Sequence, residues 1–140
     1  MVKKMNLEEL FIVREKLIHD STLLQTKDYC AAEAKYMYSY KLEYLMSQLI
    51  KHEKNTILLQ DMLLKYENKI NYTNYNLTLL LYRTCLSLDK TNTFLFKKFA
   101  EYLLLEFPKN PDSIEIAEQI SHFAELQEFD KALELVNKNI

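Results

Sequence analysis

The side chains that most often carry chemistry in proteins are few in this chain, which has three histidines and two cysteines among 140 residues. His19, His52 and His122 lie far apart, and none has a second His or a Cys three or four positions away. A metal site on a helix needs that spacing, because it places both ligands on the same face. The pattern therefore predicts no metal site and no cofactor.

Candidate nucleophiles are equally isolated. They are Ser39, Ser47, Cys30 and Cys85. No base stands beside any of them at a spacing that would activate the hydroxyl or thiol. The chain also has no glycine, so it lacks the glycine-rich loops that bind phosphate groups. We therefore predict that the protein is not an enzyme.

One cluster of titratable groups remains, because Glu118 and Glu125 stand four positions before and three positions after His122. This spacing places all three on one side of a helix. The cluster would either bind a partner or be an ordinary exposed histidine on an acidic helix.

The charge of the chain is unevenly distributed. Residues 1 to 100 hold 15 basic and 11 acidic side chains, a balance of +4, whereas residues 101 to 140 hold three basic and nine acidic ones, a balance of −6. An acidic lobe repels nucleic acid and anionic membranes and attracts basic proteins. The alternative is that it forms the polar outer face of a terminal repeat.

These residues must be positioned by helices. Without glycine the chain has no residue that readily adopts the tight turns of β-hairpins, so left-handed positions would fall to Asn or Asp. Apolar residues at helical spacing predict an all-α protein of about seven helices. The expected helices cover residues 7–25, 29–51, 57–64, 77–88, 94–107, 112–124 and 129 to the C-terminus.

Helix boundaries follow from capping residues and prolines. Asn6, Asn55 and Thr93 are expected to begin helices, the sequence from Asp112 to Glu115 resembles a capping box, and Pro108 ends a helix. The asparagine-rich segment 68–76 is expected to be the longest loop. It separates an N-terminal hairpin, residues 1–70, from residues 77–140, within one continuous domain.

The longest expected helix, residues 29–51, carries two apolar stripes. The first comprises Ala31, Ala34, Tyr38, Leu42, Leu45 and Leu49, and the opposite stripe comprises Tyr29, Tyr36, Tyr40 and Tyr44, with Lys41 beside it. The tyrosines either stack against a peptide or single-stranded RNA or form a middle layer buried on both faces.

The chain has the features of an intracellular protein. Its N-terminus shows neither a secretory signal nor a membrane span, because charged residues interrupt every apolar run there. Cys30 and Cys85 lie within apolar helical patterns, so we expect both to be buried, reduced thiols. These observations predict a cytoplasmic location and no membrane partner.

Residues 77–140 show a weak internal repeat. A shift of 36 positions pairs apolar residues, for example Leu80 with Ile116 and Phe99 with Leu135. Such pairing is typical of stacked helical hairpins, in which each hairpin covers its neighbour's apolar face. The pattern predicts antiparallel helical hairpins stacked as a short right-handed α-solenoid.

This segment resembles a tetratricopeptide repeat, or its half-a-tetratricopeptide variant. The resemblance is carried by Phe107 to Pro111 as the turn between repeats, by Phe123, and by the run from Phe129 to Ala132. Phe96 and Ile120 depart from it, since the family prefers small residues there. The resemblance implies a protein that binds peptides or acts as a scaffold in a larger assembly.

The sequence therefore predicts a non-enzymatic interaction module, an adaptor or scaffold subunit with a protein or peptide partner. The expected partner-binding residues are Tyr29, Tyr36, Tyr40, Lys41, Tyr44, Glu118, His122 and Glu125. A ribosome- or RNA-associated factor using the basic N-terminal part is the first alternative. A peptide-sensing regulatory domain is the second, and a homodimer formed through an uncovered apolar face is also open.

Overall fold

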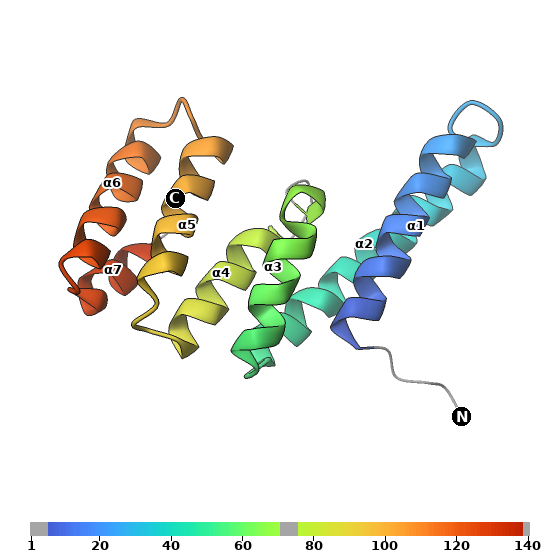
Figure 1. The fold of residues 1–140 in the computed structure, drawn as a ribbon. Helices are drawn as coiled ribbons and strands as arrows, with labels where there is room; N and C mark the ends of the chain where they lie inside the picture. The colour runs from blue at the N-terminus through green and yellow to red at the C-terminus, as the bar shows by residue number, and fades with distance from the viewer. Residues whose placement is uncertain (1–5, 71–75, 139–140) are drawn as a thin grey trace. The chain divides into compact units, whose positions relative to one another are not determined.

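The computed structural model describes residues 6–70 and 76–138, and within these ranges the protein is entirely helical (Figure 1). Its seven described helices are α1 (Leu7–Leu24), α2 (Tyr29–His52), α3 (Thr56–Ile70), α4 (Leu77–Leu88), α5 (Thr93–Glu106), α6 (Pro111–Glu125) and α7 (Phe129–Val136). The described residues contain no β-strand, which confirms the predicted all-α class. None of the described helices is long and apolar enough to cross a bilayer.

Asparagine and aspartate side chains begin most of these helices, because they accept hydrogen bonds from backbone amides that have no partner within the helix. Asn6 accepts a hydrogen bond from the backbone N–H of Glu9 at 2.9 Å, and Asp28 accepts one from Ala31 at 3.1 Å. Asn55 accepts hydrogen bonds from the first turn of α3. Residues 53–55 therefore separate α2 from α3, and the predicted break there is confirmed.

Three local predictions were wrong. Asn92, not Thr93, caps α5, and Asn110, not Asp112, caps α6, since their side chains accept the exposed amides. Helix α3 continues to Ile70, so part of the expected loop 68–76 is helical; residues 71–75 lie outside the described ranges. A left-handed backbone occurs at Asn76, with φ 48°, as expected for asparagine, but also at Gln127, with φ 60°.

The chain divides into two compact units, residues 1–81 and 82–140, and the division falls within α4. In the first unit α1 and α2 pack antiparallel, as the short connection predicts. Late residues of α1 meet early residues of α2, since the Ser21 hydroxyl donates to the Ala32 carbonyl oxygen at 2.9 Å. Asp20 and Lys35 form an ion pair at 3.7 Å.

The centre of this helix pair contains a buried ion pair. Arg14 Nε donates to Glu43 Oε1 at 2.8 Å, and the two side chains are only 4% and 3% exposed. A charge removed from water loses its hydration, so a buried pair is tolerated only when each partner satisfies the other. The pair therefore specifies which residues of α1 and α2 face one another.

The buried side of α2 differs from the predicted one. It comprises Ala32, Ser39, Leu42, Glu43, Met46, Ser47 and Ile50. Of the predicted apolar stripe, Tyr38 and Leu45 are about half exposed, at 52% and 51%. The prediction was wrong because it chose the buried side of α2 by hydrophobicity. Helix α1 instead packs on the side that carries Glu43 and small residues, where Arg14 and Ser21 of α1 form hydrogen bonds with α2.

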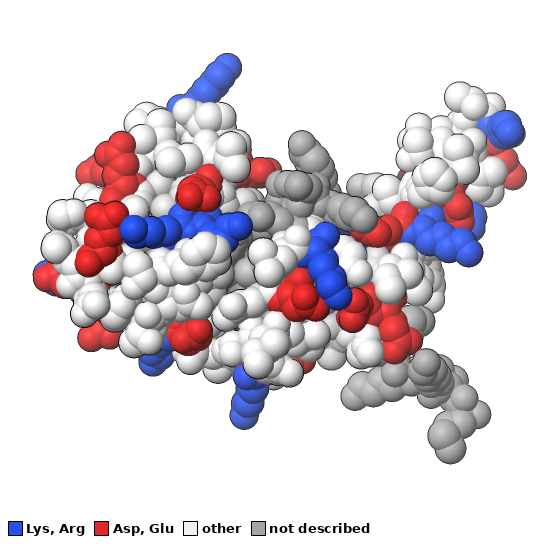
Figure 2. All heavy atoms as spheres, in the orientation of Figure 1, with Lys and Arg blue, Asp and Glu red and all other residues white. Residues whose placement is uncertain are grey.

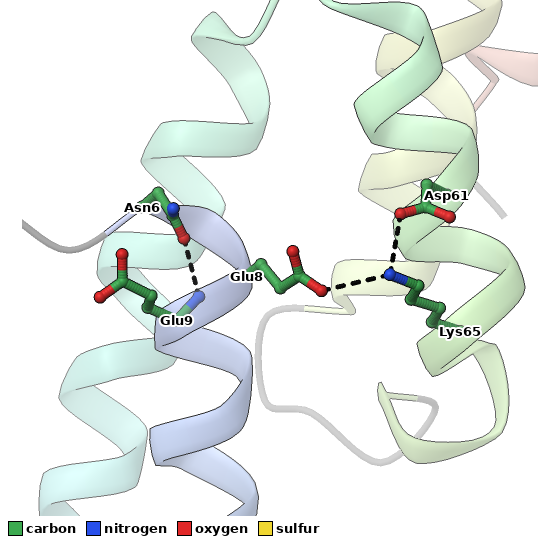
Figure 3. Close-up of polar contacts among 5 residues, drawn as sticks. All are labelled: Asn6, Glu8, Glu9, Asp61 and Lys65. Atoms are coloured by element: carbon green, nitrogen blue, oxygen red, sulfur yellow. Dashed lines mark hydrogen bonds and ion pairs between the residues drawn. The ribbon is translucent and has the colours of Figure 1, made fainter.

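Helix α3 contacts the start of α1. The rings of Phe11 and Tyr66 stack with their centroids 5.0 Å apart. Lys65 lies between Glu8 of α1 and Asp61 of α3, and its ammonium group is 3.3 Å and 3.1 Å from their carboxylates (Figure 3). The aromatic contact is buried, whereas the ion pairs lie at the surface.

In the second unit, α5 packs against α6, and α6 packs against α7. Tyr82 contacts Phe99 at 5.4 Å between ring centroids, and Phe96 stacks on Phe129 at 6.0 Å. Arg83 donates from Nε to the carbonyl oxygen of Val136 at 2.8 Å. Arg83 also donates from Nη2 to the carbonyl oxygen of Lys138. Helix α4 therefore satisfies carbonyl groups at the C-terminal end of α7.

Both cysteines are free thiols, as predicted. Cys85 is buried, but Cys30 is exposed at the start of α2. The expectation that both are buried was therefore wrong for Cys30, because this turn of α2 presents Cys30 away from α1.

The buried ion pair leads to a first prediction. Replacing Arg14 alone with alanine leaves Glu43 buried without its charged partner, and should lower the free energy of unfolding by about 3–5 kcal/mol. The double variant R14M/E43L removes both charges and keeps a similar volume, so it should be close to wild-type stability. Urea denaturation of both variants followed by circular dichroism measures this, and an R14A variant as stable as wild type would contradict it.

Candidate functional site

One side of α2 exposes a continuous set of large apolar and aromatic side chains. The exposed fractions are 68% for Tyr29, 45% for Tyr36, 49% for Met37, 52% for Tyr38, 38% for Tyr40, 50% for Tyr44 and 51% for Leu45. The sequence left open whether the tyrosines form a binding strip or a layer buried on both faces. In the structure they are exposed, so they do not form a buried layer.

This exposure follows from the packing of α1. Ser39 is 1% exposed and faces α1, whereas Met37, two positions away, lies roughly 200° around the helix. We call the side around Met37 the α2 face. It comprises Tyr29, Cys30, Glu33, Ala34, Tyr36, Met37, Tyr38, Tyr40, Lys41, Tyr44 and Leu45, and all of these are exposed. The buried serines and the exposed tyrosines are consequences of the same orientation.

Two hollows lie along α2. Tyr40, Lys41, Tyr44 and Leu45 line one of about 360 Å³, and its walls are mainly apolar. The other, of about 240 Å³, lies where α1 meets α2 and is lined by Ser21, Gln25, Tyr29, Ala32, Glu33 and Tyr36. Both are partly open to solvent, so they suit side chains of a macromolecular partner better than an enclosed small molecule.

Two of the candidate nucleophiles, Ser39 and Ser47, lie on the buried side of α2. The hydroxyl groups of Ser39 and Ser47 donate to the carbonyl oxygens of Tyr36 and Tyr44, each at 2.6 Å. Each hydroxyl therefore satisfies a carbonyl of its own helix on the buried side of α2. Among the described residues, no group of three or more His, Cys, Asp or Glu side chains is arranged to hold a metal ion.

The second candidate cluster lies on α6, in the second unit. Glu118, His122 and Glu125 are all exposed. Glu125 pairs with Lys97 of α5 at 3.0 Å, so part of its charge is neutralised within the second unit. Figure 2 shows acidic side chains gathered over α6 and α7 with basic ones among them. The cluster is thus part of a mixed charged surface.

The basic side chains near α3 differ in their surroundings. Lys51, His52 and Lys54 are exposed at the junction of α2 and α3. Lys65 is held by two carboxylates (Figure 3), and the side chain of Lys69 lies outside the described part of the chain. Because its charge is balanced by two carboxylates, Lys65 adds little to the positive charge that this region could use to bind a phosphate backbone.

The sequence did not identify Glu33 and Met37 as members of the site. Both lie between the predicted tyrosines and Lys41 on the exposed side of α2. Hydrophobicity alone could not place Met37 in the site, because methionine is also common in buried cores. Only the position of α1 shows which side of α2 is open.

Comparisons of this chain with protein-family models, with curated proteins and with solved structures found no significant match.

Lys65 gives a second prediction. Its hydrogen bonds to Asp61 and Glu8 raise the pKa of Lys65 above the ordinary value of 10.5. The folded state therefore favours the charged form, and this stabilisation is fully present below pH 10.5 and is lost as the pH rises through the raised pKa. The effect should be small, because the ammonium is exposed.

The measurement compares the free energy of unfolding of wild type and K65M across this pH range, with K54M as the control for loss of an exposed lysine. The wild type should have a higher free energy of unfolding than K65M at neutral pH, and the difference between these two proteins should shrink at alkaline pH. A difference that grows as the pH rises would contradict the assignment.

Proposed function

We propose that this protein is a protein–protein interaction module that binds a partner through the α2 face. The observation that carries the proposal is the exposure of five tyrosines, a methionine and a leucine along one side of a single helix. Contiguous apolar surface of this kind is costly in water and typically marks an interaction site. Tyrosine suits such a site because its ring buries a large area while its hydroxyl stays hydrated.

The charge of the α2 face favours a protein over a nucleic acid. Glu33 lies one helical turn before Met37, and Lys41 lies one turn after it. A surface that follows a phosphate backbone needs a continuous run of cations beside the aromatic rings. One lysine and one glutamate instead match a protein surface that carries both charges.

A finer statement of the fold belongs to the same proposal. We propose that the helices form tetratricopeptide-like hairpins that stack as a short α-solenoid. The antiparallel pair α1 and α2 supports this, as does the packing of α5 against α6. Such a stack would present the long helix α2 as a rigid edge to the partner.

A site-specific crosslink tests the proposed function. The photoreactive residue p-benzoylphenylalanine replaces Tyr40 in one variant and Phe94 in a second, because both are exposed aromatic side chains and only Tyr40 is on the α2 face. Irradiation in the source cell should crosslink protein to position 40 at least tenfold more efficiently than to position 94. Equal crosslinking at both positions, no crosslink, or a nuclease-sensitive product at position 40 would each contradict the proposal.

A further inference from the structure

We propose that the partner of the α2 face is a second copy of this chain, bound antiparallel, with the two-fold axis passing beside Met37. This inference rests on the proposed function, because it requires that the α2 face bind protein. The order of side chains along the face supports it. Charge and size at positions before Met37 complement those at equal distances after it, so two antiparallel copies match.

The exposed side of α2 has the spacing of a helix–helix seam. The exposed residues Cys30, Ala34, Met37, Lys41 and Tyr44 and the half-buried Gln48 follow one another at alternating intervals of four and three positions. This alternation keeps side chains on one side of a helix and is the spacing found where two long helices pack along their lengths. The seam covers about five helical turns, on the side opposite to the buried contact with α1.

Charge selects the antiparallel direction. Glu33 lies four positions before Met37, and Lys41 lies four positions after it. In an antiparallel pair centred on Met37, Glu33 of each copy is level with Lys41 of the other, so two identical ion pairs form, as two-fold symmetry requires. In a parallel pair, Glu33 would be level with Glu33 of the other copy and Lys41 with its Lys41, so like charges would repel. Among the described residues, neither side chain is paired within its own chain.

Side-chain size agrees with the same register. Cys30 lies seven positions before Met37, and Tyr44 lies seven positions after it. The antiparallel arrangement therefore places a small thiol of one copy level with a large ring of the other, twice, and Met37 meets itself at the axis. Small residues opposite large ones allow two helices to approach closely, and methionine adapts to irregular gaps.

The apolar surroundings of Lys41 also fit an interface. Lys41, whose ammonium group stands on a long aliphatic stem, lines the hollow together with Tyr40, Tyr44 and Leu45. A second helix lying across this hollow would cover the stem while the ammonium group reaches the partner's carboxylate at the edge. The charges then stay at the rim of the contact, where they set its direction without being buried.

Charge reversal tests this register with the full-length protein. Analytical ultracentrifugation should show a reversible dimer at concentrations up to about 100 μM. The single variants E33K and K41E each create two like-charge contacts, and each should dissociate at least tenfold more readily than wild type. Circular dichroism confirms that each variant is folded, and Lys54→Glu and Glu118→Lys are the matched controls, since both reverse an exposed charge that is not on α2.

Two combinations should restore dimerisation. The double variant E33K/K41E exchanges both charges and re-forms the ion pairs in the homodimer. An equimolar mixture of the two single variants should form heterodimers, because the two lysines of one chain then meet the two glutamates of the other. A partner that is not a copy of this chain would show neither behaviour.

Failure of this inference is distinct from failure of the proposed function. A wild-type protein that stays monomeric, a dimer that ignores both reversals, or single variants that neither combination restores would each overturn the antiparallel dimer. A crosslink from position 40 to a different protein would also overturn it, while leaving the α2 face as a protein-binding surface. The absence of any protein crosslink at that position would instead overturn the proposed function itself.

Discussion

The orientation of α2 about its own axis is the constraint on which the candidate site depends, and the Arg14–Glu43 ion pair is the contact that specifies it. A buried charge has to face its partner, so Glu43 can point only toward α1. Ser21, Ala32 and Ser39 are buried in the same unit, and these small side chains let the two helices lie close together. Once this side of α2 is buried, the opposite side is open.

The tyrosines of the chain illustrate the result. Tyr66 and Tyr82 are buried and contact phenylalanine rings within their own units, where they contribute to the cores. The tyrosines of α2 are chemically the same, yet they remain exposed because no described helix of their own unit covers them. The proposed function and the proposed dimer both follow from this difference in surroundings.

Much of the secondary structure could be predicted from local sequence. Asn6 and Asn55 begin helices because a side-chain oxygen next to a helix start can accept free amides, and Pro108 follows the end of α5 because it cannot continue a helix. The same reasoning failed at Thr93 and Asp112, where an asparagine one or two positions earlier takes the cap. Capping residues compete, and sequence alone does not rank neighbours that can each accept the hydrogen bonds.

The sequence by itself determined that this chain is helical, where most helices begin and end, and that the longest one carries tyrosines at helical spacing. These properties depend on contacts within a few residues, so they can be found from spacing and residue type. The tertiary structure alone decided which side of α2 is buried. That choice depends on Arg14, which lies 29 positions from Glu43 and pairs with it only after α1 folds back along α2. The tertiary structure therefore also decided that Glu33, Met37 and Lys41 share an exposed side. A hydrophobic pattern describes a helix but does not say which neighbour covers it.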